Sequence, residues 1–246
     1  MATFEEALYK LWPNGDRHIP GLRAAMVATA APVFEKYGIN TKTAMLQFMA
    51  QISHECGAGL EVEENLSYTA ERMTQVWPTR FRSIAEAEPY AHNPRALANK
   101  VYGGRMGNSA SNDDGWNYRG RGATQCTGKE GYQKLAAKTG LDLLNHPELV
   151  NTPETFMECG AGDFVLCGCM IYALGGDLYH VTLRLNGGTV GLAERQHWLN
   201  QWTSMNVELP IASKVARPLP PVVQSSPVPP KQGWLAMLKS LFTRES

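Results

Sequence analysis

Two acidic positions in this sequence are able to perform acid–base chemistry, namely Glu55 and the adjacent pair Glu63 and Glu64. Glu55 follows Phe48 by seven positions and Ile52 by three, so on a helix it lies along an apolar face. It also falls in the last helical turn, where the negative end of the helix dipole disfavours a charged carboxylate. Both effects favour the protonated form, as a general acid working near neutral pH requires. The alternative is a structural ion pair between a helix-terminal glutamate and an arginine.

Glu63 and Glu64 come eight and nine residues after Glu55, beyond a break at 57–59 that contains two glycines. A loop carboxylate there can face Glu55 across a cleft, and we expect it to stay solvated and ionised. Two carboxyl groups whose environments separate their protonation states are typical of glycoside hydrolysis. Taken alone, an acidic pair in a loop more often contributes only to solubility.

Other catalytic and metal-binding motifs are incomplete. His54-Glu55 begins a zinc-protease H-E-x-x-H motif, but position 58 is alanine. Gly128-Lys129 is followed by glutamate, where a phosphate-binding loop needs serine or threonine. The calcium-loop pattern at 112–115 lacks its first ligand, and no G-x-S-x-G motif is present. The cysteines lack the paired C-x-x-C spacing of structural zinc sites. We therefore predict that the protein uses neither a metal ion nor a cofactor.

Five blocks of sequence follow one another over roughly residues 40–205. They are 53–57, 63–72, 90–108, 114–128, and 185–188 together with Arg195. In this order they closely resemble glycoside hydrolase family 19, in particular the chitinase-like endolysins of bacteriophages. The resemblance implies a lysozyme-like, mainly helical fold with a cleft between two lobes, and an inverting mechanism.

The resemblance also assigns roles to individual residues. Glu55 matches the general acid and Glu64 the general base, with Glu63 the less favoured candidate for the base. Thr127 matches a position that helps the base hold the attacking water. The remaining matches line the sugar-binding cleft: Gln125, Tyr132, Asn186 and Arg195.

A glycine-rich stretch at 103–122 is expected to form a long ordered loop, and such loops are usually functional. Its Trp116, Tyr118, Arg119 and Arg121 offer stacking surfaces and hydrogen-bond donors to sugar hydroxyls. We therefore add Tyr118 and Arg119 to the predicted binding residues, with His54 beside the acid. The alternative for Trp116 is that its ring pins the loop to the core.

The elements that must position these residues are predicted to be helices. Thr3 with Glu6 indicates a capping box that opens a short helix ended by Pro13, and Ser83 with Glu86 indicates another. Alternation of apolar and polar residues is scarce, so 60–68 is at most a short hairpin or an extended loop. Further helices are expected at 21–37, 41–56, 94–102, 129–139, 154–174, 177–185 and 191–203.

Composition limits the class of protein. The chain has 246 residues with 23 basic and 23 acidic side chains, so it is not a nucleic-acid-binding protein that works through overall basicity. Its five cysteines do not fit a secreted disulfide framework and favour reduced, mostly buried thiols in a protein folded in a cytosol. The first 13 residues lack the basic and apolar regions of a signal peptide, and no apolar run of about 18 residues exists.

Three parts of the chain are predicted, with residues 1–207 as the catalytic domain. Residues 208–232 form a proline-rich linker, and residues 233–246 form a cationic amphipathic helix. Residues 211–246 contain five basic residues against one acidic residue, so the zero net charge is the sum of an acidic domain and a basic end. The helix could engage an anionic membrane or lipopolysaccharide, or it could dock on the catalytic domain.

These features together predict a monomeric endolysin that hydrolyses the β-1,4 bonds of peptidoglycan glycan strands as a muramidase. We expect it to accumulate in the bacterial host cytoplasm and to reach the cell wall through a permeabilised membrane. Alternatives are a chitinase acting on N-acetylglucosamine polymers, a secreted antibacterial muramidase effector, and a non-catalytic wall-binding module. Retention of both Glu55 and Glu64 argues against the last of these.

Overall fold

The computed structural model describes residues 1–210, in which the chain is mainly helical, as predicted. The only β-type pairings in this part are isolated bridges. None of its helices is long and apolar enough to cross a membrane. The predicted helix 233–246 and most of the predicted linker lie outside the described residues.

The α-helices are α1 (Phe4–Leu11), α2 (Leu22–Tyr37), α3 (Lys42–Glu55), α4 (Ala70–Val76), α5 (Ile84–Ala87), α6 (Pro94–Tyr102), α7 (Asp114–Asn117), α8 (Lys129–Thr139), α9 (Pro153–Leu166), α10 (Met170–Leu174), α11 (Leu178–Asn186) and α12 (Leu192–Ser204).

Most helix ends lie where the sequence predicts them. Thr3 and Glu6 form the complete capping box at the start of α1, with each side chain accepting the other's backbone N–H. Gly38 and Gly140 end α2 and α8 in the left-handed region, with φ of 74° and 84°. Ser83 caps α5 by accepting the N–H of Glu86, but the Glu86 carboxylate accepts from Arg82 and so forms only half of the predicted box.

The predicted helix 154–174 is wrong, because it is interrupted between Leu166 and Met170. Gly168 has φ of 73°, and a Cβ there would lie 2.9 Å from an Arg184 nitrogen. The Arg184 Nε donates to the Cys167 carbonyl at 2.8 Å, which pairs a carbonyl at the end of α9. A side chain from α11 thus stabilises the end of the helix. The predicted loop 103–122 likewise contains a short helix, α7, and the sequence did not predict α4.

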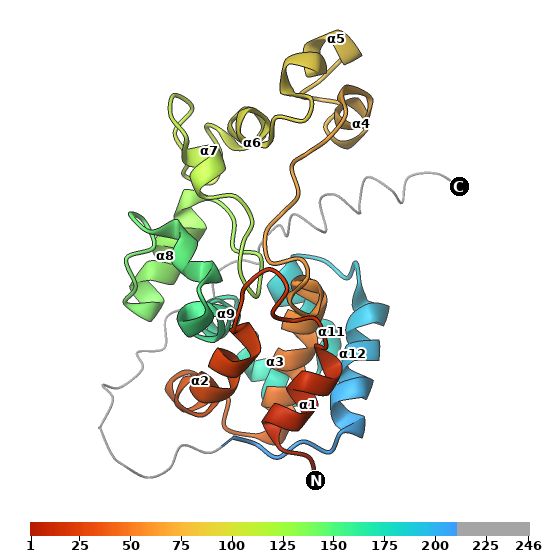
Figure 1. Ribbon diagram of the computed structural model, residues 1–246, viewed down its shortest axis with the longest axis vertical. Coiled ribbons are helices and arrows are strands. Elements are labelled where there is room, and N and C mark those ends of the chain that lie inside the picture. The colour runs from red at the N-terminus through yellow and green to blue at the C-terminus, as the bar shows by residue number, and fades with distance from the viewer. Residues whose placement is uncertain (211–246) are drawn as a thin grey trace.

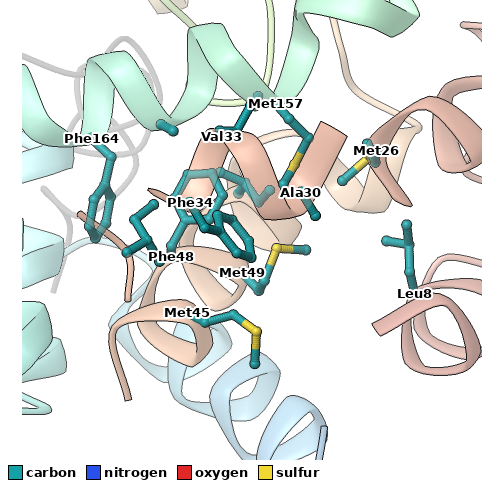
Figure 2. Packing of buried hydrophobic residues seen from close by; sticks show 14 of the residues in the cluster. Leu8, Met26, Ala30, Val33, Phe34, Met45, Phe48, Met49, Met157 and Phe164 are labelled. Carbon is teal, nitrogen blue, oxygen red and sulfur yellow. The ribbon is translucent and has the colours of Figure 1, made fainter. Parts of the chain in front are cut away.

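Helix α3 is at the centre of the larger hydrophobic cluster. Its predicted apolar residues Met45, Phe48, Met49 and Ile52 are all fully buried. Phe48 packs edge-on against Phe34 of α2 and Phe164 of α9, with ring centroids 5.9 and 5.4 Å apart, and Figure 2 shows these rings side by side. Packing on several sides fixes the axis of α3 and therefore the place of Glu55 at its end.

A second group of helices lies apart from this cluster. Figure 1 shows α4, α5 and α6 at the top of the molecule, separated from α1, α2, α3 and α12. They share a separate hydrophobic cluster that includes Trp77, Phe81 and Tyr102, while a third cluster surrounds α8. The extended segment 60–69 connects α3 to α4. The described part of the chain therefore has three hydrophobic clusters, with Glu55 at the end of an element in the largest one.

The five cysteines are buried and form no disulfide in the described part of the chain, as the composition predicted. They are Cys56, Cys126, Cys159, Cys167 and Cys169. The described part therefore folds around reduced thiols.

Ser53 joins three elements in the interior. Its hydroxyl oxygen accepts a hydrogen bond from the indole N–H of Trp12 at 2.9 Å and another from Trp202 at 3.0 Å. All three residues are fully buried. The end of α1 and helix α12 are thus tied to α3 two residues before Glu55.

We expect Ser53→Ala to lower the free energy of unfolding by about 2–4 kcal/mol, because two buried indole donors lose their acceptor. Urea denaturation monitored by tryptophan fluorescence measures this change. Ser204→Ala, at an exposed position on α12, serves as the control and should change stability by less than about 0.5 kcal/mol. A loss for Ser53→Ala no larger than that of the control would contradict the role assigned to Ser53.

Candidate active site

Glu55 is the last residue of α3, and its carboxylate forms an ion pair with Arg195 of α12. The side chains are 5% and 0% exposed, respectively. Arg195 also donates from Nη1 to the Val190 carbonyl at 2.8 Å. A Cβ on Gly191 would lie 2.6 Å from that nitrogen and 2.5 Å from Nε2 of His54. Only a glycine at position 191 therefore leaves space for both the guanidinium and the imidazole.

The surroundings of Glu55 combine the two environments that the sequence left open. The apolar burial is present, because Phe48 and Ile52 on the same helix are fully buried. The arginine partner is present as well. Glu55 therefore lies at the end of an apolar helix face and also contacts a guanidinium.

Glu64 lies in the extended segment after α3 and is 5% exposed. Its Oε2 accepts a hydrogen bond from the Tyr102 hydroxyl at 2.7 Å, and its Oε1 accepts one from the Gly120 N–H at 2.7 Å. Burial raises the pKa of Glu64 to about 7, although both hydrogen bonds and Arg119 act to lower it. The expectation that this carboxylate is solvated and fully ionised is therefore wrong. The physical reason is the packing of α6 and the loop at 120 around it.

Glu63 has a different environment from its neighbour. Its side chain is 39% exposed and forms ion pairs with Arg119 and Arg121. The Arg119 guanidinium in turn lies 3.5 Å from the centre of the Trp116 ring. Glu63 thus holds two buried arginines of the loop in place, while its backbone forms an isolated bridge with Arg121.

The predicted residues Gln125 and Thr127 lie in a tight loop that pairs with this segment. Gln125 has φ of 52° and donates from Nε2 to the carbonyls of Glu61 at 2.9 Å and Gly122 at 3.0 Å. Its Oε1 is buried without a partner among the described residues. The Thr127 hydroxyl donates to the Gln125 carbonyl at 3.0 Å. Both side chains therefore lie on the chain that also supplies the Gly120 N–H to Glu64.

Two of the predicted sugar-binding tyrosines are buried with internal hydrogen bonds. Tyr118 donates to the Leu144 carbonyl at 2.9 Å, and Tyr132, fully buried, donates to the Arg119 carbonyl at 3.0 Å. In this structure both hydroxyls support the loop that carries Arg119 and Gly120. Their predicted contact with sugar stays a prediction.

The other predicted binding residues gather around Glu55. Asn186, at the end of α11, donates to the Val190 carbonyl at 3.1 Å, the same carbonyl that Arg195 contacts. His54 is half-buried and borders a hollow of about 560 Å³ beside the end of α3. The structure thus brings His54, Asn186 and Arg195 together on one side, and Thr127 and Gln125 on the chain that holds Glu64.

Tyr102 is the site residue that sequence reasoning missed. It lies in the block 90–108, but nothing in its local spacing distinguishes it from a core tyrosine at the end of a helix. Its contact with Glu64 joins residues 38 positions apart. Only the fold shows that the two side chains meet.

No protein-family model matches the sequence. The chain is, however, 31% identical over 206 residues to a protein of Haemophilus influenzae described as a glycosyl hydrolase family 19 domain-containing protein. That match covers 79% of this chain and 92% of the relative.

The structure is similar to two solved structures of chitinase C. One is a glutamate-to-glutamine variant, with a TM-score of 0.53 and 18% identity over 82% of this chain and 75% of the other. The second is the chitinase C from Streptomyces griseus HUT6037, with a TM-score of 0.51 and 16% identity over 82% of this chain and 90% of the other. At these identities the likeness concerns the fold, and it confirms the predicted lysozyme-like helical architecture.

The raised pKa of Glu64 makes folding stability depend on pH. The folded protein retains a proton on Glu64 up to about pH 7, whereas the unfolded chain loses it near the ordinary value of 4.5. Stability from this group is therefore complete below about pH 4.5 and is lost as pH rises to about 7. We expect the difference in free energy of unfolding between wild type and Glu64→Gln to change by about 3 kcal/mol between pH 4 and pH 8.

Urea denaturation across this pH range measures the effect. As pH rises, the wild type should lose free energy of unfolding relative to Glu64→Gln. Glu35→Gln, at an exposed position on α2, is the control and should leave the wild-type pH profile unchanged. Parallel profiles for wild type and Glu64→Gln would show that Glu64 titrates normally.

Proposed function

The chain belongs to glycoside hydrolase family 19, and we propose that it cleaves the β-1,4 bonds of bacterial peptidoglycan as an endolysin-type muramidase. As a member of this family it is a glycoside hydrolase, so the open questions are the substrate and the roles of its residues. The observation that carries the proposal is the pair Glu55 and Glu64. Both are buried carboxyl groups, and each is held by partners of its own.

In the proposed reaction Glu55 is the general acid that protonates the glycosidic oxygen. Arg195 donates a hydrogen bond from Nη2 to Oε1 of Glu55, which leaves Oε2 free to carry the proton and deliver it. As the proton leaves, negative charge develops on Glu55 beside the guanidinium. Arg195 then stabilises the transition state more than the neutral acid, as electrostatic catalysis requires.

Glu64 is the proposed general base, which takes a proton from the water that attacks the anomeric carbon. A carboxylate with a pKa of about 7 is a stronger base than an ordinary glutamate and is still substantially ionised at neutral pH. Thr127 is proposed to help hold the water. Attack from the side opposite the leaving group inverts the anomeric configuration and needs about 6.5–9.5 Å between the carboxyl groups.

The loop and α12 side chains are proposed to bind the sugar. The buried, unpartnered Oε1 of Gln125 can accept a hydrogen bond from an N-acetyl N–H group. His54, Asn186 and Arg195 lie together beside the acid and Arg119 lies beside the base, so both ends of the scissile bond have polar side chains nearby. N-acetyl groups occur in both chitin and peptidoglycan, so this recognition alone does not select between them.

The state of the cysteines favours peptidoglycan. Five buried cysteines without a disulfide suit a protein that folds in a reducing cytosol, from which a lysin reaches the wall once the membrane is opened. The resemblance of its sequence blocks to phage endolysins points the same way. The solved structures of similar fold are chitinases, so cleavage of N-acetylglucosamine polymers is the second candidate.

We expect Glu55→Gln and Glu64→Gln each to lower kcat by about 10²–10⁴-fold on purified peptidoglycan, because each removes one proton-transfer step. Release of reducing sugar measures the rate, and turbidity clearing of permeabilised Gram-negative cells provides a second readout. Glu35→Gln is the matched control and should keep wild-type activity. Clearing by Glu55→Gln at the wild-type rate would overturn the assignment of the acid.

Mass spectrometry of the products identifies the bond that is cleaved. A muramidase leaves N-acetylmuramic acid at the reducing end, whereas a chitinase releases chitobiose-type fragments from chitin. Chitin cleavage without any action on peptidoglycan would replace the first candidate with the second.

A further inference from the structure

The Glu64 carboxylate is held by two hydrogen bonds that come from different elements. Tyr102, the last residue of α6, donates its hydroxyl proton to Oε2 at 2.7 Å. The Gly120 N–H donates to Oε1 at 2.7 Å, and the Glu64 N–H returns a bond to the Gly120 carbonyl at 3.0 Å. Each oxygen therefore has one fixed donor and retains further lone pairs for a water molecule.

The backbone of Tyr102 is also fixed by a hydrogen bond, which comes from the side chain of Asn108. Its carbonyl accepts a hydrogen bond from Nδ2 of Asn108 at 3.1 Å, and Oδ1 of Asn108 accepts the N–H of Lys129 at 2.8 Å. These bonds join the end of α6 to the start of α8. The phenol ring is buried in the cluster of α4 and α6. A buried ring on a doubly anchored backbone is a rigid donor, so the hydroxyl defines where Oε2 lies.

The charged and titratable groups around Glu64 explain why this donor matters. Burial raises the pKa of Glu64 most, Arg119 from the loop lowers that pKa, and Glu63 raises it slightly. Burial and then the Glu64 charge raise the pKa of Tyr68 and of Tyr102, and Arg105 partly lowers that of Tyr102. The phenol of Tyr102 therefore stays protonated and remains a donor at every working pH. No described cation forms an ion pair with Glu64, so the hydroxyl and the amide are its hydrogen-bonding support.

We propose that Tyr102 is a positioning residue for the general base, fixing the Glu64 carboxylate and stabilising its ionised form. This inference rests on the proposed role of Glu64 and adds a residue to the machinery that activates water. Tyr102 does not touch the reacting atoms in this scheme. It acts through Glu64, and its influence should be visible in how activity depends on pH.

Tyr102→Phe tests the proposal, because it removes the hydroxyl and keeps the ring. A hydrogen bond to a charged group contributes enough to move a pKa by about one unit. We expect the acidic limb of the kcat/KM profile on peptidoglycan to move up by about one pH unit, with about tenfold lower activity at pH 5.5 and a much smaller loss at pH 9. A loss of the same size at every pH would show a merely structural role and overturn the proposal.

Tyr37→Phe is the matched control. Tyr37 is also a buried tyrosine whose hydroxyl donates to a carboxylate, that of Glu158 at 3.2 Å, but it lies on α2. Its removal should leave the acidic limb at the wild-type pH. A shift of the limb in this variant as large as that in Tyr102→Phe would show that the effect is not specific to Glu64.

A second measurement follows the ionisation of the Glu64 carboxyl by NMR and does not depend on catalysis. In full-length protein labelled with ¹³C at the glutamate carboxyls, the Glu64 resonance is the one missing from Glu64→Gln. The pH at the midpoint of the titration of this resonance should rise by about one unit in Tyr102→Phe and stay unchanged in Tyr37→Phe. An unmoved midpoint overturns the proposal. If wild type cleaves no glycan, the proposed function fails, and this titration still decides whether Tyr102 sets the ionisation of Glu64.

Fluorotyrosine at position 102 covers the case in which Tyr102→Phe does not fold. Ring fluorination preserves the shape of the side chain and makes the phenol a stronger donor. The Glu64 midpoint and the acidic limb should then both move to lower pH. A midpoint that stays at the wild-type value would overturn the proposal in the same way.

Discussion

The buried ion pair between Glu55 and Arg195 is the interaction on which the rest of the site depends. Removing two charges from water carries a large desolvation penalty, and such pairs often add little net stability. The main effect of the Glu55–Arg195 pair is therefore to fix the position of α12 relative to the end of α3. The pair joins the end of α3 to the first turns of α12, and its guanidinium also fixes the chain at Val190. Gly191 suits this place because its φ is 79° and a Cβ there would lie 2.6 Å from Nη1 of Arg195. The pair thus links two segments that are 140 positions apart in the sequence.

The two carboxyl groups are buried to the same degree but are supported by different chemistry. Glu55 faces a full positive charge, whereas the hydrogen bonds to Glu64 come from a neutral hydroxyl and a neutral amide. Burial raises the pKa of Glu64, and the neutral donors offset that rise only in part. This difference matches the proposed division of labour better than burial alone. It also corrects the simpler expectation of one apolar carboxyl and one solvated carboxyl.

Local sequence signals predicted the elements but not the partners. The capping box at Thr3, the end of α2 at Gly38 and the buried face of α3 depend on residues within a few positions of one another, and they were predictable. Resemblance to a family supplied Glu55, Glu64 and Arg195 as candidates. The burial of Glu64, its bond to Tyr102 and the break of the helix at Gly168 all arise from contacts between distant segments. No periodicity or local motif encodes such contacts, so the environment of Glu64 could be known only from the fold.

The turn directly after Glu55 connects α3 to the segment that carries Glu64. Gly57, Ala58 and Gly59 have φ of 54°, 54° and 89°, so three successive residues adopt the left-handed region. For Ala58 this conformation costs about 1–2 kcal/mol. The Cys56 carbonyl offsets the strain by accepting the N–H groups of Gly59 and Glu61, both at 2.9 Å. The chain leaves α3 in a direction that no continued helix would take and enters the segment that pairs with the loop at Gly120. If Glu55 and Glu64 act as the proposed acid and base, a short strained turn held by the Cys56 carbonyl is a suitable connection between them, because inversion requires a fixed separation of the two carboxyl groups.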